Sequence, residues 1–139
     1  PSNHPTFHCR DFKGPLAPLS QSIISSELSS TPLHSTTVLH TQSQWIGKRV
    51  HVYGRVMNVY SRIMGVNWIR LCDQKQDRAL VITTQDPISV GSEVLIEGLL
   101  NSDIQVGQVY HFDRLLQSAH ILHIQKESTP APYKPKADL

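Results

Sequence analysis

One stretch of the chain, residues 49–61, alternates between apolar and other side chains with a period of two. In its sequence, RVHVYGRVMNVYS, Val50, Val52 and Val56 fall on the same face of an extended strand as Gly54. A glycine inside a strand marks a bend or the close approach of another backbone. The alternation therefore predicts one long, curved β-strand, as is typical of small barrels.

Four more apolar segments follow, separated by turn sequences such as DQKQD and QDPISVG. The further strands that we expect are residues 66–72, 78–84, 92–100 and 109–124. Five strands in so short a region predict an all-β fold, a five-stranded antiparallel Greek-key barrel of the OB-fold type. An SH3-like barrel or a small sandwich is the structural alternative.

The barrel is expected to occupy residues 45–124, between two segments without sustained periodicity. Residues 1–44 form an arm rich in Ser, Thr and Pro, with one short helix expected near residues 20–28, and residues 125–139 form a tail rich in Pro and Lys. Because such segments gain order by lying on another surface, we expect them to bind partner subunits or other copies of the chain. The expected contact residues are Phe7, Phe12, Leu16, Ile23, Leu28, Leu33 and Tyr133.

The charge balance is a weak argument for nucleic acid. The net charge is +2, and residues 48–114 hold eight basic and seven acidic side chains, so a positive groove would need an uneven arrangement of these charges. OB barrels nevertheless bind single strands by stacking bases on aromatic side chains in a basic groove. The residues that could do so are Tyr53, Arg55, Tyr60, Arg62, Trp68 and Arg70.

Other chemistry has less support in the sequence. The two cysteines, Cys9 and Cys72, fit one disulfide or two free thiols equally well, and they show no zinc or redox spacing. The histidines His120 and His123 are three apart, a spacing that would send them to opposite faces of a strand. We expect no metal site, no cofactor and no catalytic activity.

The start and hydropathy of the chain bear on its location. No apolar run approaches the roughly 20 residues that cross a bilayer. The chain begins with Pro1, which is consistent with removal of a secretory signal. We therefore expect an exported protein, periplasmic or extracellular.

Two segments resemble a known group of proteins. IGKRVHVYGRVMNVYSRIMGVNWIRLCD and LVITTQDPISVGSEVLIEGLL are similar to small exported bacterial OB-fold proteins of the tRNA-anticodon-binding-like type, over about residues 46–122. This chain departs from their pattern at Ser92, where an aspartate is usual, and in its histidine-rich last strand. The resemblance implies the OB-fold, and it implies nucleic-acid binding only by analogy of fold.

Two functions are consistent with these patterns. The first is a non-catalytic accessory or structural subunit of a larger bacterial assembly, in which the barrel is rigid and the arms bind protein. The second is an OB-fold protein that binds single-stranded nucleic acid or a nucleotide.

Overall fold

The computed structural model describes Cys9, Leu33–His34, Val38 and residues 44–73 and 78–127. The helix expected near residues 20–28 lies outside these residues. The strands are β1 (Leu33–His34), β2 (Arg49–Ile63), β3 (Val66–Cys72), β4 (Leu80–Thr84), β5 (Ser92–Val106) and β6 (Tyr110–Glu127). All five strands predicted from the sequence are present, and β1 is an addition that the sequence did not indicate.

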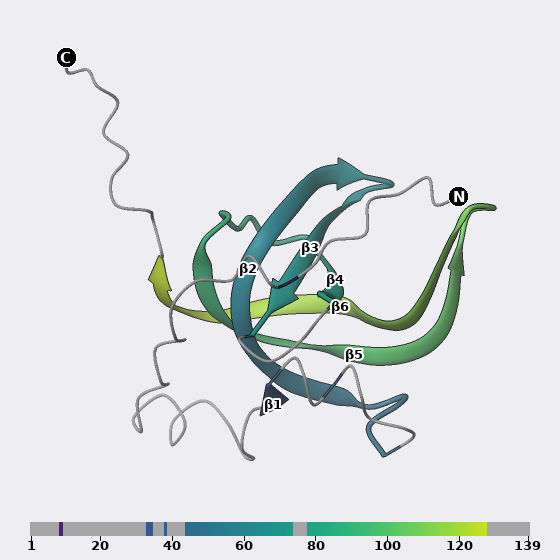
Figure 1. Cartoon of the computed structure of the whole chain (residues 1–139), viewed down its shortest axis with the longest axis horizontal. Helices are drawn as coiled ribbons and strands as arrows, with labels where there is room; N and C mark the ends of the chain where they lie inside the picture. The colour runs from purple at the N-terminus through teal and green to yellow at the C-terminus, as the bar shows by residue number, and fades with distance from the viewer. Residues whose placement is uncertain (1–8, 10–32, 35–37, 39–43, 74–77, 128–139) are drawn as a thin grey trace.

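Strands β2 to β6 close into a ring in the order β2, β3, β4, β6, β5 and back to β2, which is an OB-like barrel (Figure 1). The prediction of a purely antiparallel barrel is wrong in one respect, because β4 and β6 pair in parallel. Each antiparallel pairing reverses the strand direction, and five reversals cannot return a ring to its starting direction. A closed ring of five strands must therefore contain a parallel pair.

Strand β2 takes part in both sides of the closure. Its first half pairs with β5 and its second half pairs with β3. Gly54 lies where the two pairings meet, and a Cβ atom there would be 2.8 Å from Leu71 Cγ and 2.9 Å from the carbonyl oxygen of Cys72. The glycine foreseen as a bend is required because β3 comes so close at this point.

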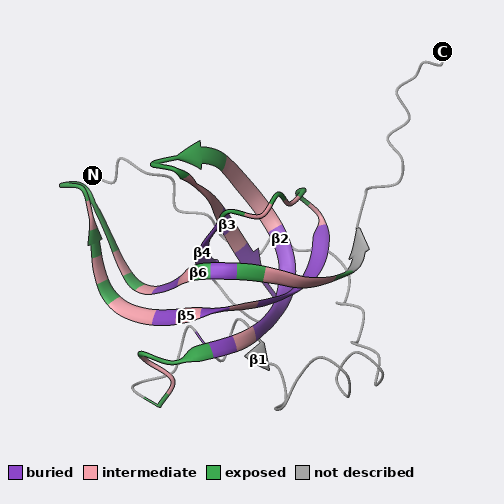
Figure 2. Ribbon diagram, turned by 180° about the vertical axis from the view of Figure 1, so that it is seen from behind, coloured by how far each residue is buried: buried purple, intermediate pink, exposed green. Residues whose placement is uncertain are grey.

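The barrel interior is filled by the alternating apolar face of every strand. Val52, Ile69, Ile82 and Ile96 are among its fully buried residues. Val38 belongs to the same core although it precedes the barrel in the sequence. Figure 2 shows this buried ring, whereas the ends of the β2–β3 and β5–β6 hairpins are exposed.

The described part of the arm is attached to the barrel. Cys9 is bonded to Cys72 of β3 with an S–S distance of 1.97 Å, and both cysteines are buried against Ala79. Strand β1, Leu33–His34, pairs in parallel with Val52 and Tyr53 of β2. Cys9, Leu33–His34 and Val38 of the arm are therefore attached to the barrel of their own chain.

The β5–β6 hairpin is longer than the sequence predicted. Strand β5 continues to Val106, beyond the expected end at Leu100, because residues 101–106 pair with β6, although NSDIQV has only two apolar residues, Ile104 and Val106. Past Leu99, β5 no longer pairs with β2, so the hairpin extends beyond the barrel (Figure 1). No helix in the described residues is long and apolar enough to cross a membrane.

Candidate nucleic-acid interface

The six residues proposed for nucleic-acid binding separate into two groups. Tyr53 and Arg55 are buried, whereas the other four belong to the β2–β3 hairpin and are half-buried or exposed. Tyr53 is 5% exposed, so a base could not stack on it without local opening. The burial of its phenol raises its pKa to about 12, and the nearby Glu93 carboxylate adds to the effect.

Arg55 and Glu93 form an ion pair on the outer face of the barrel. They are directly opposite in the β2–β5 pairing, and the Arg55 Nη2 and Nε atoms donate to Glu93 Oε2 at 2.6 and 3.1 Å. Both side chains are almost fully buried. Cys72 is the register partner of Arg55 on the other side, so the disulfide to Cys9 lies beside the pair.

The remaining group forms an aromatic and basic face on the outside of β2 and β3. Tyr60 and Trp68 are opposite each other, and the Arg70 guanidinium lies over the Tyr60 ring, 5.7 Å from its centre. The indole of Trp68 stacks on Phe112 of β6, with ring centres 5.8 Å apart, and its Nε1 atom donates to the Ile63 carbonyl at 2.8 Å. We call Tyr60, Trp68, Arg70 and Phe112 the hairpin face.

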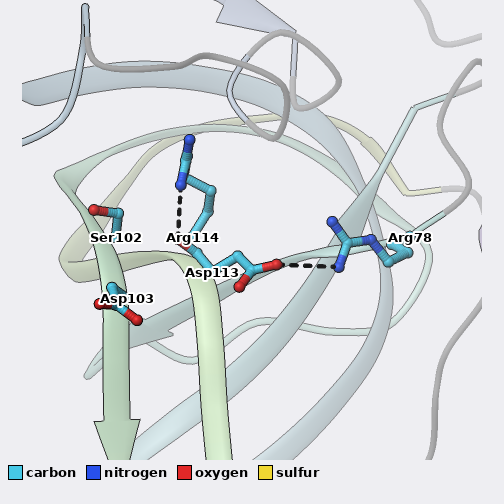
Figure 3. A pocket seen from close by; sticks show the side chains of 5 residues that line it. All are labelled: Arg78, Ser102, Asp103, Asp113 and Arg114. Atoms are coloured by element: carbon cyan, nitrogen blue, oxygen red, sulfur yellow. Dashed lines mark hydrogen bonds and ion pairs between the residues drawn. The ribbon is translucent and has the colours of Figure 1, made fainter.

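A polar cavity lies at the base of the β5–β6 hairpin. Its volume is about 300 Å³, and Figure 3 shows its lining residues, Arg78, Ser102, Asp103, Asp113 and Arg114. Arg78 Nη1 is 3.8 Å from Asp113 Oδ2, and Arg114 Nη1 donates to the Asp113 carbonyl oxygen at 2.9 Å. The cavity adds two guanidinium groups from elements other than the β2–β3 hairpin.

Sequence reasoning did not find Phe112 or Arg114. Neither has a local signature, because each lies in a strand with ordinary alternation, far in sequence from the β2–β3 hairpin. Only the closure of the barrel and the length of β5 bring the β5–β6 hairpin to Trp68.

Three acidic side chains of the barrel are held in contacts with other groups. Glu93 is paired with Arg55, and Glu97 accepts hydrogen bonds from Arg49 Nε and Nη2 at 2.7 and 3.2 Å. The bonds from Arg49 lower the pKa of Glu97. Asp86 accepts a hydrogen bond from the backbone N–H of Ile121. These three acidic groups are thus held in contacts, whereas Asp103 and Asp113, the latter next to Phe112 in β6, are mostly exposed.

The histidines of β6 do not lie as predicted. His120 is opposite Glu97 and His123 is opposite Leu95, and the two β5 residues share one face. An irregularity in the pairing between Leu95 and Ile96 adds a residue to β6, so the expectation that the two histidines face opposite sides is wrong. No group of ligating side chains in the described residues is arranged to hold a metal ion.

The proposed protein contacts of the arm and tail are mostly beyond what the structure describes. Phe7, Phe12, Leu16, Ile23, Leu28 and Tyr133 lie outside the described residues. Leu33 pairs through its backbone with Val52 of its own chain.

Comparison with known proteins supports the fold. No protein-family model matches the chain, and no curated protein matches it. Among solved structures, a protein from Leishmania major Friedlin that is assigned as an aspartyl-tRNA synthetase matches with a TM-score of 0.54 and 17% identity. The match covers 76% of this chain and 23% of the other, so the chain spans about a quarter of that protein. The likeness is one of fold.

Proposed function

We propose that the protein is a non-catalytic OB-like module that binds single-stranded nucleic acid on the hairpin face. The observation that carries the proposal is the gathering of Trp68, Phe112 and Tyr60 with Arg70 on the outside of β3. OB-folds bind oligonucleotides on the corresponding strands and between the two corresponding hairpins. Stacking on partly exposed rings is tolerant of sequence, since every base has a flat face.

The proposal differs from the sequence hypothesis in the residues that it uses. Tyr53 and Arg55 have no role in it, because they are buried in the free protein. Arg78 and Arg114 are given no phosphate contact, because the cavity that they line also holds the carboxylates of Asp103 and Asp113. The matched structure, which is assigned as an aspartyl-tRNA synthetase, supports this proposal only through its fold.

Export of the protein is part of the same proposal. The disulfide between Cys9 and Cys72 supports it, because structural disulfides persist in oxidising compartments and are rare in the cytosol. A bacterial, periplasmic or extracellular location is the form of export that the sequence resemblance suggests.

Titration of tryptophan fluorescence tests nucleic-acid binding directly. The chain has two tryptophans, so a Trp45→Phe variant isolates the signal of Trp68. An oligothymidine should quench this signal with an affinity that falls as salt rises. Arg70→Gln should weaken binding and reduce the salt slope by about 1, if Arg70 contacts one phosphate.

Arg49→Gln is the matched control. Arg49 is an arginine at the start of β2, and it is bonded to Glu97, away from the hairpin face. The substitution should leave the affinity unchanged. Quenching that is absent at low salt, or equally reduced by both variants, would reject binding at this face.

The accessory-subunit hypothesis is a second candidate, and one observation favours it. No described strand pairs with the outer edge of β5 over residues 101–106. An open edge can accept a strand from a partner subunit. In a complex isolated from the native source, the backbone amides of residues 101–106 should exchange their hydrogens more slowly than in the purified chain. Equal rates of hydrogen exchange, or isolation of the chain without a partner, would argue against the accessory-subunit hypothesis.

A further inference from the structure

The exposed large apolar side chains of the described residues gather at the ends of two hairpins. Ile63 and Met64 are at the end of β2–β3, Val109 and Tyr110 are at the end of β5–β6, and they are between 38% and 64% exposed. Only Val90 and Ile124 among such described residues lie elsewhere. Exposed apolar groups that cluster in this way mark an interaction surface.

Packing between the hairpins brings the two ends to the same side of the molecule. Trp68 donates to the carbonyl of Ile63, at the end of one hairpin, and its ring stacks on Phe112 in the other. Figures 1 and 2 show the two ends in the same half of the molecule along its long axis, with the β5–β6 end reaching further out. The four apolar side chains are therefore available to one binding partner.

The turn of the β2–β3 hairpin sets the backbone conformation at its end. Arg62 and Met64 have φ angles of 59° and 54°, in the left-handed region that long side chains disfavour. Met64 and Gly65 form the two-residue loop between Ile63 and Val66, and such a loop takes a positive φ at both positions; Arg62 lies at the irregular pairing between Tyr60 and Ile63. These conformations present an arginine and a methionine on either side of Ile63.

The two hairpins carry opposite charges. The end of β2–β3 has Arg62 and no acidic residue over residues 61–65. Residues 101–113 of the β5–β6 hairpin hold Asp103 and Asp113, whose side chains are 84% and 64% exposed, and no lysine or arginine; Arg114 follows in β6. Asp103 contacts His111, and Asp113 is near Arg78, but both carboxylates keep most of their surface in water. One hairpin is thus complementary to the other in charge, and both ends are apolar.

We propose that these hairpin ends bind a second copy of this chain in a two-fold symmetric dimer. The β2–β3 end of each copy would pack on the β5–β6 hairpin of the other, with Ile63 and Met64 against Val109 and Tyr110. Arg62 would then face Asp103 and Asp113 of the second copy. A two-fold interface must be self-complementary, and the two hairpins together meet that condition. The inference does not depend on nucleic-acid binding.

A charge exchange between copies tests this arrangement. In analytical ultracentrifugation the native chain should form a dimer whose dissociation constant rises at least tenfold for Arg62→Asp, and also for the double variant Asp103→Arg/Asp113→Arg. Each variant dimer brings like charges together twice. An equimolar mixture of the two variants should recover native affinity, because both contacts of the mixed dimer are then oppositely charged.

Two controls separate this interface from a general effect of charge or of folding. Lys48→Asp, an exposed lysine outside both hairpins, should leave the dimer unchanged, and so should Val90→Ser, whereas Met64→Ser should weaken it. Equal denaturation midpoints show that all variants are folded. A monomeric native chain, or a mixture of charge variants that stays monomeric, overturns the proposal and leaves these ends to a partner of other chemistry.

Discussion

Replacing Arg55 by methionine should destabilise the protein more than any exposed charge change, since Glu93 would be left buried without its ion pair. The structure places both side chains almost out of water, at 9% and 1% exposed, with two hydrogen bonds between them. Loss of one partner of a buried pair typically costs about 3–5 kcal/mol, because the other charge stays desolvated. With a urea m-value of about 2 kcal/mol/M, the midpoint should fall by roughly 2 M.

The double variant Arg55→Met/Glu93→Leu isolates the cause. Replacing both charges by apolar groups removes the desolvated carboxylate, so most of the lost stability should return. Arg55→Lys should fall between the native chain and Arg55→Met, as it keeps the charge but loses the paired geometry. Urea denaturation followed by circular dichroism measures all three. A loss below about 1 kcal/mol for Arg55→Met, the range of exposed pairs, would refute the reasoning.

Three further predictions concern stability. Cys9→Ser/Cys72→Ser should lower the free energy of unfolding by about 4 kcal/mol, from the loop entropy of a bond that spans 63 residues; reduction of the native chain should lower the urea midpoint similarly. The free energy of unfolding should fall by at most about 3 kcal/mol as pH rises from 10 towards 12, because the folded state holds the Tyr53 proton more tightly than the unfolded state. Tyr53→Phe should flatten this part of the profile of stability against pH. Gly98→Ala should cost about 1–3 kcal/mol, because its Cβ would lie 2.7 Å from Leu116 Cγ, and a thermal midpoint that does not change would contradict the packing.

The candidate site could be only partly predicted from the sequence. Trp68 and Arg70 alternate within β3, so a period of two was enough to place them on one face. Strict alternation from Val52 and Val56 would put Tyr60 on the inner face, and the irregular pairing between Val56 and Asn58 turns it outward beside Trp68. Alternation also placed Tyr53 and Arg55 on the outer face of β2, but it could not show that this part of the outer face is buried next to Cys9 and Cys72. Burial of an outer face depends on what covers it, and no local pattern contains that information.

The sequence by itself determined the five barrel strands and the apolar face of β2 as far as Val56, because alternation is a local property of a strand with one buried side; beyond the irregular pairing at Val56 and Asn58 the faces exchange, and Val59 packs on the core. It also marked Gly54 as a special position. Tertiary structure alone decided the parallel β4–β6 pairing, the extension of β5 to Val106 and the contact between Trp68 and Phe112. Each of these depends on which strands become neighbours when the ring closes, and neighbours distant in sequence leave no trace in local periodicity.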